Sequence, residues 1–282
     1  MGRIFKYEMK RRLNMILILG GVMAVLSVGT ILLMLVEGVN FSHGYNGSAV
    51  FWWYIITLFA VIFIPTVMFF MCSNGHVDEL LYKDTNYLML TIPVRSESVL
   101  GGRILAGFVE FLVYSMISLV FFIIFAALQA AQFGGISGIT GITFRSALSA
   151  ILQTVFVYNT LPTLYIAFLT VSGFLLVGTV FICVKALTRS FIRKKTLAQF
   201  IAVILFILVM SQIARLGRYL SLEWGFVQYI DVHITNIGAG DIFFHGLSQP
   251  MPVYLVTVIM MFLLSAGFFV CGSWLVAKKV EL

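Results

Sequence analysis

One carboxylate, Glu110, lies inside an apolar run of residues long enough to cross a membrane. A charge within the hydrocarbon of a bilayer is costly, and it normally faces a bundle interior, a wet cavity or an opposite charge. Arg103 lies seven positions earlier, on the same face of a helix and about 10 Å away along its axis. Two hypotheses follow, and the sequence favours neither. Glu110 and Arg103 could belong to a translocation pathway or gate, or Glu110 could form a structural pair with a basic residue such as Arg103.

Two further groups of residues carry atoms that can bind metals. Cys72 and His76 are four positions apart, a spacing at which one helix face can present two ligands, although Asn74 and Gly75 would interrupt that helix. The second group combines two carboxylates and two imidazoles, and its alternative interpretation is a solvated loop: Asp231, His233, Asp241 and His245. Two ligands do not make a site, and we predict no metal in this protein.

Motifs of catalysis are missing from the sequence. It contains no phosphate-binding loop of the ATPase type, no H-E-x-x-H zinc motif and no G-x-S-x-G nucleophile motif. We therefore predict no catalytic residue and no enzyme activity in this chain. If the protein uses ATP, another chain must bind it.

The composition is that of an integral membrane protein. The chain has 282 residues, of which 61% are hydrophobic and 10% charged, against about 25% charged residues in a typical soluble domain. We predict an all-α, single-domain fold with six transmembrane helices. Their expected ranges are 14–36, 49–72, 104–131, 163–185, 197–213 and 251–277.

The fourth span is the least clear from the sequence. The uncharged run between Arg145 and Lys185 is too long for one ordinary span and barely long enough for two. Two spans would place the basic segment 185–195 outside, against the tendency of Lys and Arg to stay in the cytoplasm. We therefore interpret residues 145–159 as an external or shallow helix that is broken at Pro162.

The basic residues indicate how the chain is oriented. Six spans put both termini on one side, and that side holds 15 of the 18 Lys and Arg residues. Such an asymmetry predicts that both termini are cytoplasmic. The net charge of +7 follows from this topology, so we do not interpret it as nucleic-acid binding.

Residues 1–13 are predicted to form an amphipathic helix that lies in the membrane interface. Its apolar stripe consists of Phe5, Met9 and Leu13, while Arg3, Lys6 and Lys10 line the opposite side. The apolar run that follows is longer than the core of a signal peptide and ends without a cleavage site, so we expect it to be retained as the first span.

The insert, residues 73–103, is a charged segment between the second and third spans. Its apolar residues recur with the period of a helix, and Pro93 ends that helix because proline lacks a backbone donor. The apolar face, broken only by Asp84, consists of Val77, Leu80, Leu81, Tyr87, Leu88 and Ile92. Its charges exclude it from hydrocarbon, so it can receive a push from a soluble partner.

Residues 215–249 form a second segment outside the spans, and it could dip into the outer leaflet as a helical hairpin.

The sequence resembles a known family in three places. The insert contains Thr85-Asn86-Tyr87-Leu88-Met89-Leu90-Thr91-Ile92-Pro93-Val94-Arg95, the third span opens with Val99-Leu100-Gly101-Gly102-Arg103, and the chain ends in Lys278-Lys279-Val280-Glu281-Leu282. With the basic amphipathic start and six spans, this pattern is similar to the permease subunit of bacterial type 2 ABC exporters. Arg103 stands where that family usually has Lys.

The resemblance implies specific roles. The insert would be a cytoplasmic coupling helix seated on a separate ABC ATPase that binds ATP and Mg²⁺, and its contact residues would be Leu81, Asp84, Thr85, Tyr87, Leu88, Pro93 and Arg95. The segment between spans five and six would be an outer re-entrant hairpin that gates the pathway, with Glu223, Asp231 and His233 at the gate. A second permease, identical or related, would complete the transporter in the bacterial plasma membrane. The cargo would be a hydrophobic or amphipathic peptide, lipid or drug.

Two alternatives remain open at this point. An ATP-independent secondary transporter would be expected to carry several charges within its spans, and Glu110 is alone there. A membrane sensor or immunity protein that docks a cytosolic partner without moving cargo would have the same kind of insert.

Overall fold

The computed structural model describes residues 2–37, 49–75, 96–136, 143–192, 194–223, 227–234 and 247–279. Six of its helices are long and apolar enough to cross a membrane, which supports the prediction of a multi-pass, helical membrane protein. The candidate spans are Ile4–Leu35, Trp52–Ser73, Ser96–Ala131, Thr160–Phe191, Lys195–Leu222 and Leu255–Lys278.

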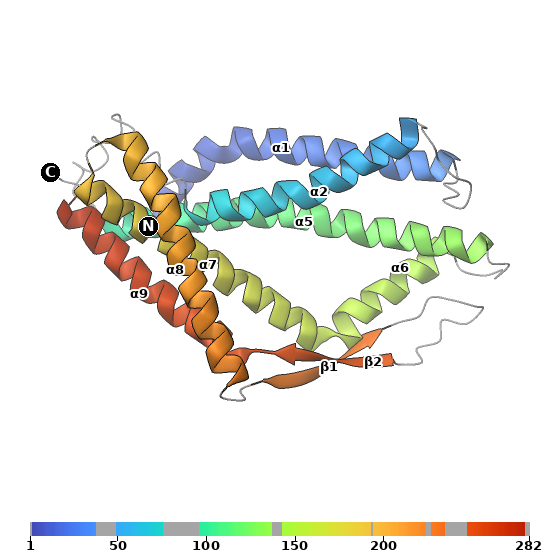
Figure 1. Ribbon diagram of the computed structural model, residues 1–282. Coiled ribbons are helices and arrows are strands. Elements are labelled where there is room, and N and C mark those ends of the chain that lie inside the picture. Colours follow the sequence, from blue (N-terminus) through green and yellow to red (C-terminus); the bar gives the residue numbers. More distant parts are fainter. Residues whose placement is uncertain are drawn as a thin grey trace.

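The helices form two groups that meet at one end of the molecule (Figure 1). The first group contains α1 (Gly2–Glu37), α2 (Ala49–Ser73) and α5 (Ser96–Ile136), which run side by side. The second contains α7 (Thr160–Phe191), α8 (Lys195–Leu222) and α9 (Leu255–Lys279). The start of α1 and the end of α9 lie at the end where the groups meet, which we call the junction end.

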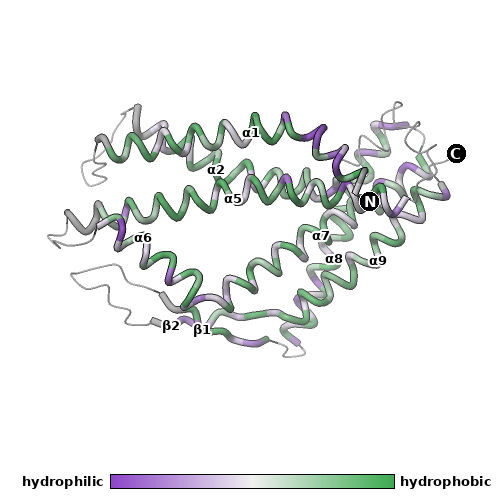
Figure 2. Tube along the Cα trace, turned by 180° about the vertical axis from the view of Figure 1, so that it is seen from behind, coloured by the Kyte–Doolittle hydropathy of each residue, from purple (hydrophilic) through white to green (hydrophobic). Residues whose placement is uncertain are grey.

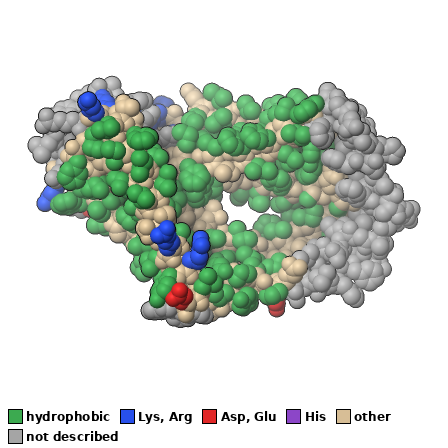
Figure 3. Space-filling view, in the orientation of Figure 1, with side chains coloured by type: hydrophobic (Ala, Val, Ile, Leu, Met, Phe, Trp, Pro, Cys, Tyr) green, Lys and Arg blue, Asp and Glu red, His purple; other side chains and the backbone are tan. Residues whose placement is uncertain are grey.

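Away from the junction end the two groups diverge. The short helix α6 (Phe144–Gln153) leads from the far end of α5 back towards α7, and the strands β1 (Gln228–Ile234) and β2 (Leu247–Val253) lie beyond it. The space-filling view shows an opening through the molecule between the diverging groups (Figure 3). The structure is therefore closed at the junction end and open further away.

The helices consist of hydrophobic residues along most of their length, as Figure 2 shows, and many of these side chains are exposed. Leu17, Val25, Phe59, Phe168 and Leu263 are each more than half exposed. Apolar surface on this scale is unfavourable in water and favourable against lipid chains. The exposure supports placing these helices in a bilayer.

Helix α1 differs from the prediction at its start. A separate interfacial helix was expected up to residue 13, but one α-helix runs from Gly2 to Glu37 without a break at Leu13 or Asn14. In its first part Leu13 is 49% exposed, whereas the charged residues Glu8 and Arg12 are buried against other helices. At 1.5 Å per residue this helix is about 54 Å long, well beyond the roughly 30 Å of hydrocarbon, so its first turns can project from it.

Two other spans begin at different places from those expected. Helix α5 starts at Ser96, so the last eight residues of the insert are the first two turns of the third span. Helix α9 starts at Leu255 instead of residue 251, because Pro250 and Pro252 belong to strand β2.

The ambiguous region before the fourth span contains a separate short helix, as predicted. Thr143 caps α6 by accepting a hydrogen bond from the backbone of Ser146, and a π-helical turn, η2 (Thr154–Tyr158), follows. The break lies at Asn159, whose backbone is not helical, and not at Pro162. Pro162 is the third residue of α7, where its missing N–H costs little because first-turn donors have no partner within the helix.

The hairpin between α8 and α9 is not helical in its described residues. Strands β1 and β2 pair antiparallel, with Asp231 opposite Pro250 and Tyr229 opposite Pro252. Tyr229 and Asp231 are exposed while Ile230 and Val232 are half-buried, the alternation expected of a strand. The two prolines are two positions apart, so both nitrogens point to the unpaired edge of the ribbon, where no donor is needed.

Candidate functional site

The candidate site lies where α2 ends and the insert begins. Gly75 has a φ of 61° and its N–H donates to the carbonyl oxygen of Cys72 at 3.0 Å, which closes the last turn of α2. Glycine adopts this left-handed conformation without a steric penalty, so it commonly ends helices. The turn formed by Cys72, Ser73, Asn74 and Gly75 is buried, which is unusual for the start of a charged loop.

Two glycines of other helices hold this turn from both sides. A Cβ added to Gly107 of α5 would overlap the carbonyl oxygen of Cys72, and one added to Gly178 of α7 would overlap that of Ser73. Small residues of this kind let helix backbones approach closely within membranes. The end of α2 is therefore wedged between one helix of each group.

Four buried charges surround the turn. Arg12 Nη1 of α1 lies 3.1 Å from Glu110 Oε2 of α5, and Arg103 Nη2 of α5 lies 3.1 Å from Glu8 Oε1 of α1. Arg12 Nε is also 3.9 Å from Glu8 Oε2. We call Glu8, Arg12, Arg103 and Glu110 the charge cluster. None of the four residues is more than 4% exposed.

The two halves of the charge cluster differ in geometry. Arg12 donates a hydrogen bond to Glu110, which also accepts one from the hydroxyl of Tyr114 at 3.4 Å. In the described structure the oxygens of Glu8 satisfy no hydrogen-bond geometry, so its contacts with arginines are ionic only. Because charge-assisted hydrogen bonds are the stronger kind, Arg12–Glu110 is the better-formed pair.

The four buried residues balance in charge because α1 and α5 each supply one acid and one base, and the part-exposed Arg11 also pairs with Glu8 at 3.1 Å. The two helices run in the same direction, so the earlier residues Glu8 and Arg103 meet, as do the later residues Arg12 and Glu110. Burying two opposite pairs costs less net free energy than burying the same charges unpaired, because the attraction within each pair offsets part of the lost solvation. Removing a single member would leave an unbalanced charge in the interior.

Arg12 also ties the cluster to the buried turn. Its Nη2 donates to the carbonyl oxygen of Gly75 at 3.0 Å, while its Nη1 bonds to Glu110. One guanidinium thus joins α1, the end of α2 and α5. Its planar fork of donors suits this double role, which an ammonium group could not reproduce.

The other end of the insert, at the start of α5, is also held at the junction end. Ser96, the first residue of α5, donates from its hydroxyl to the carbonyl oxygen of Ser273 in α9 at 3.1 Å. A Cβ on Gly102 would lie 3.1 Å from a methyl group of Ile4 in α1. Both ends of the insert are therefore fixed to helices of both groups.

The structure brings two of the predicted site residues together. Glu110 pairs with a basic residue, as one of the two hypotheses required, and the ion pair at 3.1 Å is with Arg12 of α1. Arg103 and Glu110 share the cluster through Glu8 and Arg12. Neither residue lines the cavity between α7, α8 and α9 that is described below, and a pathway role for Glu110 stays a prediction.

The predicted outer gate is far from the cluster. Glu223 follows the end of α8 and Asp231 lies in β1, and both are exposed and without an ion pair among the described residues. The backbone of His233 pairs with Ser248 across the ribbon, and its side chain lies outside the described part. The predicted ATPase contacts also lie outside the described residues, namely Leu81, Asp84, Thr85, Tyr87, Leu88, Pro93 and Arg95.

The metal candidates cannot be assembled from the described residues. His76, Asp241 and His245 lie outside them, and in the described ranges no three His, Cys, Asp or Glu side chains gather as metal ligands do. Cys72 is buried and unbridged.

Sequence reasoning missed Glu8 and Arg12. The signal was present, because an acid and a base four positions apart share one helix face, and Arg103 and Glu110 share one face of α5. Arg12 is, however, one of five basic residues among the first twelve, and nothing local marks the one that turns inward.

Comparisons of the chain with protein-family models, with curated proteins and with solved structures found no match. Its function must therefore be inferred from its own residues and their arrangement.

Proposed function

We propose that this protein is the permease subunit of an ATP-driven ABC exporter. The observation that supports it most is that both ends of the charged insert are fixed at the point where the two helix groups meet. An insert anchored in this way can pass a displacement to both groups. A flexible loop between two helices could not.

The proposed mechanism begins with a separate ATPase that binds ATP and Mg²⁺ and contacts the insert. A push on the insert reaches Cys72–Gly75 at one end and Ser96–Arg103 at the other. From the first end it passes through Arg12 to α1 and through Gly178 to α7. From the second it passes through Ser96 to α9. The groups would then move as bodies about the junction end.

Because the helices are long, a small tilt at the junction end would produce a large displacement at their far ends. Helix α5 has 41 residues, and at 1.5 Å per residue it is about 61 Å long. A tilt of about 10° at its base would displace the far end by roughly 10 Å. The divergence of the groups away from the junction gives that end room to move (Figures 1 and 3).

The charge cluster would keep the junction end stiff. Opposite charges in a medium of low dielectric constant attract strongly and tolerate little separation. Packed interfaces of this kind tend to switch between discrete arrangements instead of deforming smoothly. In this proposal Glu110 influences the translocation pathway by holding helix α5 in position. A second permease completes the channel. The cargo is a hydrophobic or amphipathic peptide, lipid or drug.

The decisive experiment targets the insert. The chain is co-expressed with any phosphate-loop ATPase that a neighbouring reading frame encodes. Leu88→Asp is compared with Asn86→Asp, because Asn86 lies on the predicted polar side of the insert helix, opposite the apolar face, with Asp78, Glu79 and Lys83. We expect Leu88→Asp to abolish co-purification and stimulation of ATP hydrolysis while membrane insertion stays intact, and Asn86→Asp to change neither. Equal association of both variants would refute the coupling role, and a membrane sensor without an ATPase partner would then be favoured.

A further inference from the structure

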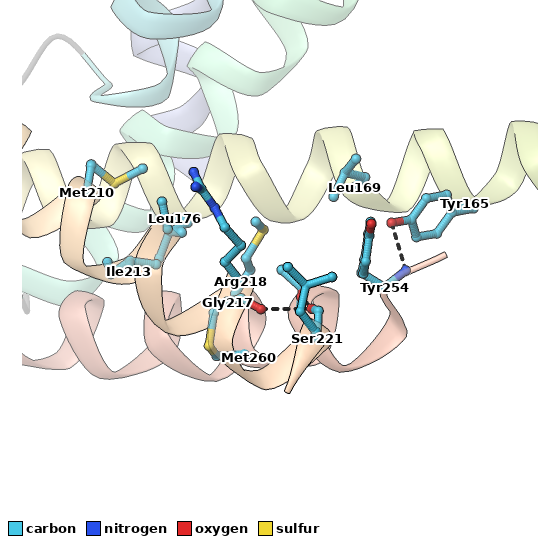
Figure 4. A pocket seen from close by; sticks show the side chains of 14 residues that line it. Tyr165, Leu169, Leu176, Met210, Ile213, Gly217, Arg218, Ser221, Tyr254 and Met260 are labelled. Carbon is cyan, nitrogen blue, oxygen red and sulfur yellow. Dashed lines mark hydrogen bonds between the residues drawn. The ribbon is translucent and has the colours of Figure 1, made fainter. Parts of the chain in front are cut away.

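A second feature lies well away from the charge cluster. A cavity of about 420 Å³ opens between the far halves of α7, α8 and α9, on the predicted outer side (Figure 4). Volumes of about 300–1,000 Å³ are usual for sites that bind small molecules. The wall is mostly apolar and includes Leu169, Leu176, Met210, Ile213, Met260 and Met261. Methionine side chains are flexible and adapt to apolar guests of irregular shape.

Most polar groups at the cavity already have partners. The hydroxyl of Ser221 lies 2.8 Å from both the carbonyl oxygen of Gly217 and the hydroxyl of Thr257. The hydroxyl of Tyr165 accepts a hydrogen bond from the backbone of Tyr254 at 3.1 Å. These groups are satisfied within the protein, so they do not require a polar ligand.

Arg218 is different. Its side chain extends from α8 towards α7 along the cavity, as Figure 4 shows, and it is exposed. Across the described ranges of the chain it makes no ion pair, and neither does Arg215, one turn earlier on α8 and also exposed. A guanidinium matches the oxygens of a phosphate with two parallel hydrogen bonds. Arg218, which lines the cavity, thus offers a cationic donor that forms no ion pair with a described side chain, and Arg215 lies one turn away on the same helix.

The depth of these groups suggests the occupant. Arg215 and Arg218 lie in the last two turns of α8, at the level expected for outer headgroups, and Met210 lies about 12 Å deeper along the axis of the helix. Arg218 therefore lies in the outer part of the cavity wall, between Ser221 and Leu222 further out and the apolar residues Met210 and Ile213 deeper in the bilayer. A cationic group with apolar wall residues deeper in the bilayer matches the anionic headgroup and the acyl chains of a phospholipid.

We propose that the cavity binds one acyl chain of an anionic phospholipid from the outer leaflet, with its phosphate on Arg218 and Arg215. This site does not depend on the exporter function, because it requires only that α7, α8 and α9 span the bilayer. It also gives a reason for the position of two of the three basic residues on the predicted outer side.

The test measures which lipid stays with the protein. The full chain is purified without any partner, delipidated and equilibrated with equal amounts of phosphatidylglycerol and phosphatidylethanolamine. Native mass spectrometry then counts the lipids retained. We expect one phosphatidylglycerol to be retained in preference, and the preference to fall about tenfold or more in Arg215→Gln/Arg218→Gln. Arg145→Gln, which removes an exposed arginine on α6, should leave it unchanged.

A second pair of variants tests the cavity itself. Ala214 lines it, so Ala214→Phe should fill it and displace the retained lipid, whereas Ala167→Phe, at an exposed position of α7, should not. Equal retention of the two lipids by the unaltered protein would overturn the proposal, as would a preference that survives both the double arginine variant and Ala214→Phe. Loss of the preference in either of these variants, with Arg145→Gln and Ala167→Phe unaffected, would support it.

Discussion

Arg12 and Glu110 are 98 positions apart in the chain and form a buried ion pair at 3.1 Å. Helix α1 precedes the insert in the sequence and α5 begins within it, and the pair brings the first parts of the two helices together. The same arginine holds the carbonyl oxygen of Gly75 at the end of α2. One guanidinium therefore links α1 to both α5 and the end of α2.

The Arg12–Glu110 pair should behave as a coupled unit. Glu110→Gln leaves Arg12 buried without its counter-charge, and Arg12→Gln does the converse, so each change should destabilise the protein by about 3–5 kcal/mol. The double variant is neutral, so it should lose clearly less than the sum of the two. Thermal unfolding of the purified protein in detergent measures all three, and additive losses would contradict the pairing.

The same variants separate a structural role of Glu110 from a role in transport. Arg12→Gln/Glu110→Gln should restore much of the yield that Glu110→Gln loses. If Glu110 also serves the pathway, transport by the double variant should stay low at equal expression. Recovery of transport together with yield would leave the pair a purely structural role.

The glycine contacts of the junction should tolerate no side chain. Gly107→Ala and Gly178→Ala would each press a methyl group on a backbone carbonyl, which cannot rotate away, and we expect losses of about 1–3 kcal/mol. Gly21→Ala and Gly267→Ala are matched controls, because nothing lies within 4 Å of the added Cβ there. In the controls the unfolding temperature should stay constant or rise slightly, since alanine favours helix. Equal behaviour of the two sets would show that α2 is not wedged between α5 and α7.

The spans were predictable from the sequence, and the contacts between them were not. Long apolar runs identify six helices because the cost of exposing polar backbone in lipid leaves few other structures possible. Glu110 stood out for the same reason, as a charge within such a run. Its partner could not be found in this way, because pairing of α1 with α5 depends on the packing of segments about a hundred residues apart.

The errors have local physical causes. The helical hairpin expected within residues 215–249 rested on mixed polarity, while the alternation from Tyr229 to Val232 was a sign of a strand. The break expected at Pro162 overlooked that proline is tolerated in a first helical turn. The roles of Gly107 and Gly178 could not be seen among the 24 glycines of the chain, because they depend on the position of a carbonyl in another helix.

A hydrogen bond between α1 and α2 provides a milder test of packing within the first group. The hydroxyl of Thr30 donates to that of Thr57 at 2.8 Å, and both residues are buried. Thr57→Val keeps the shape and removes the bond, so it should cost about 0.6–1.7 kcal/mol. Thr66→Val is the control, because in the described structure that hydroxyl bonds only to Ile62 of its own helix. A larger loss in the control than in Thr57→Val would show that the bond between the helices adds nothing.

The predicted orientation can be tested by labelling single cysteines in a variant without its three native ones. Lys83→Cys lies in the insert, and Glu223→Cys lies at an exposed position just after α8, so they should face opposite sides of the membrane. A maleimide that cannot cross membranes should label Glu223→Cys in intact cells and Lys83→Cys only after the cells are opened. The physical reason is that fifteen of the 18 basic residues belong to the side that holds the insert. If Lys83→Cys is labelled in intact cells, the insert faces outward, no cytosolic ATPase can reach it, and the coupling mechanism fails with the topology.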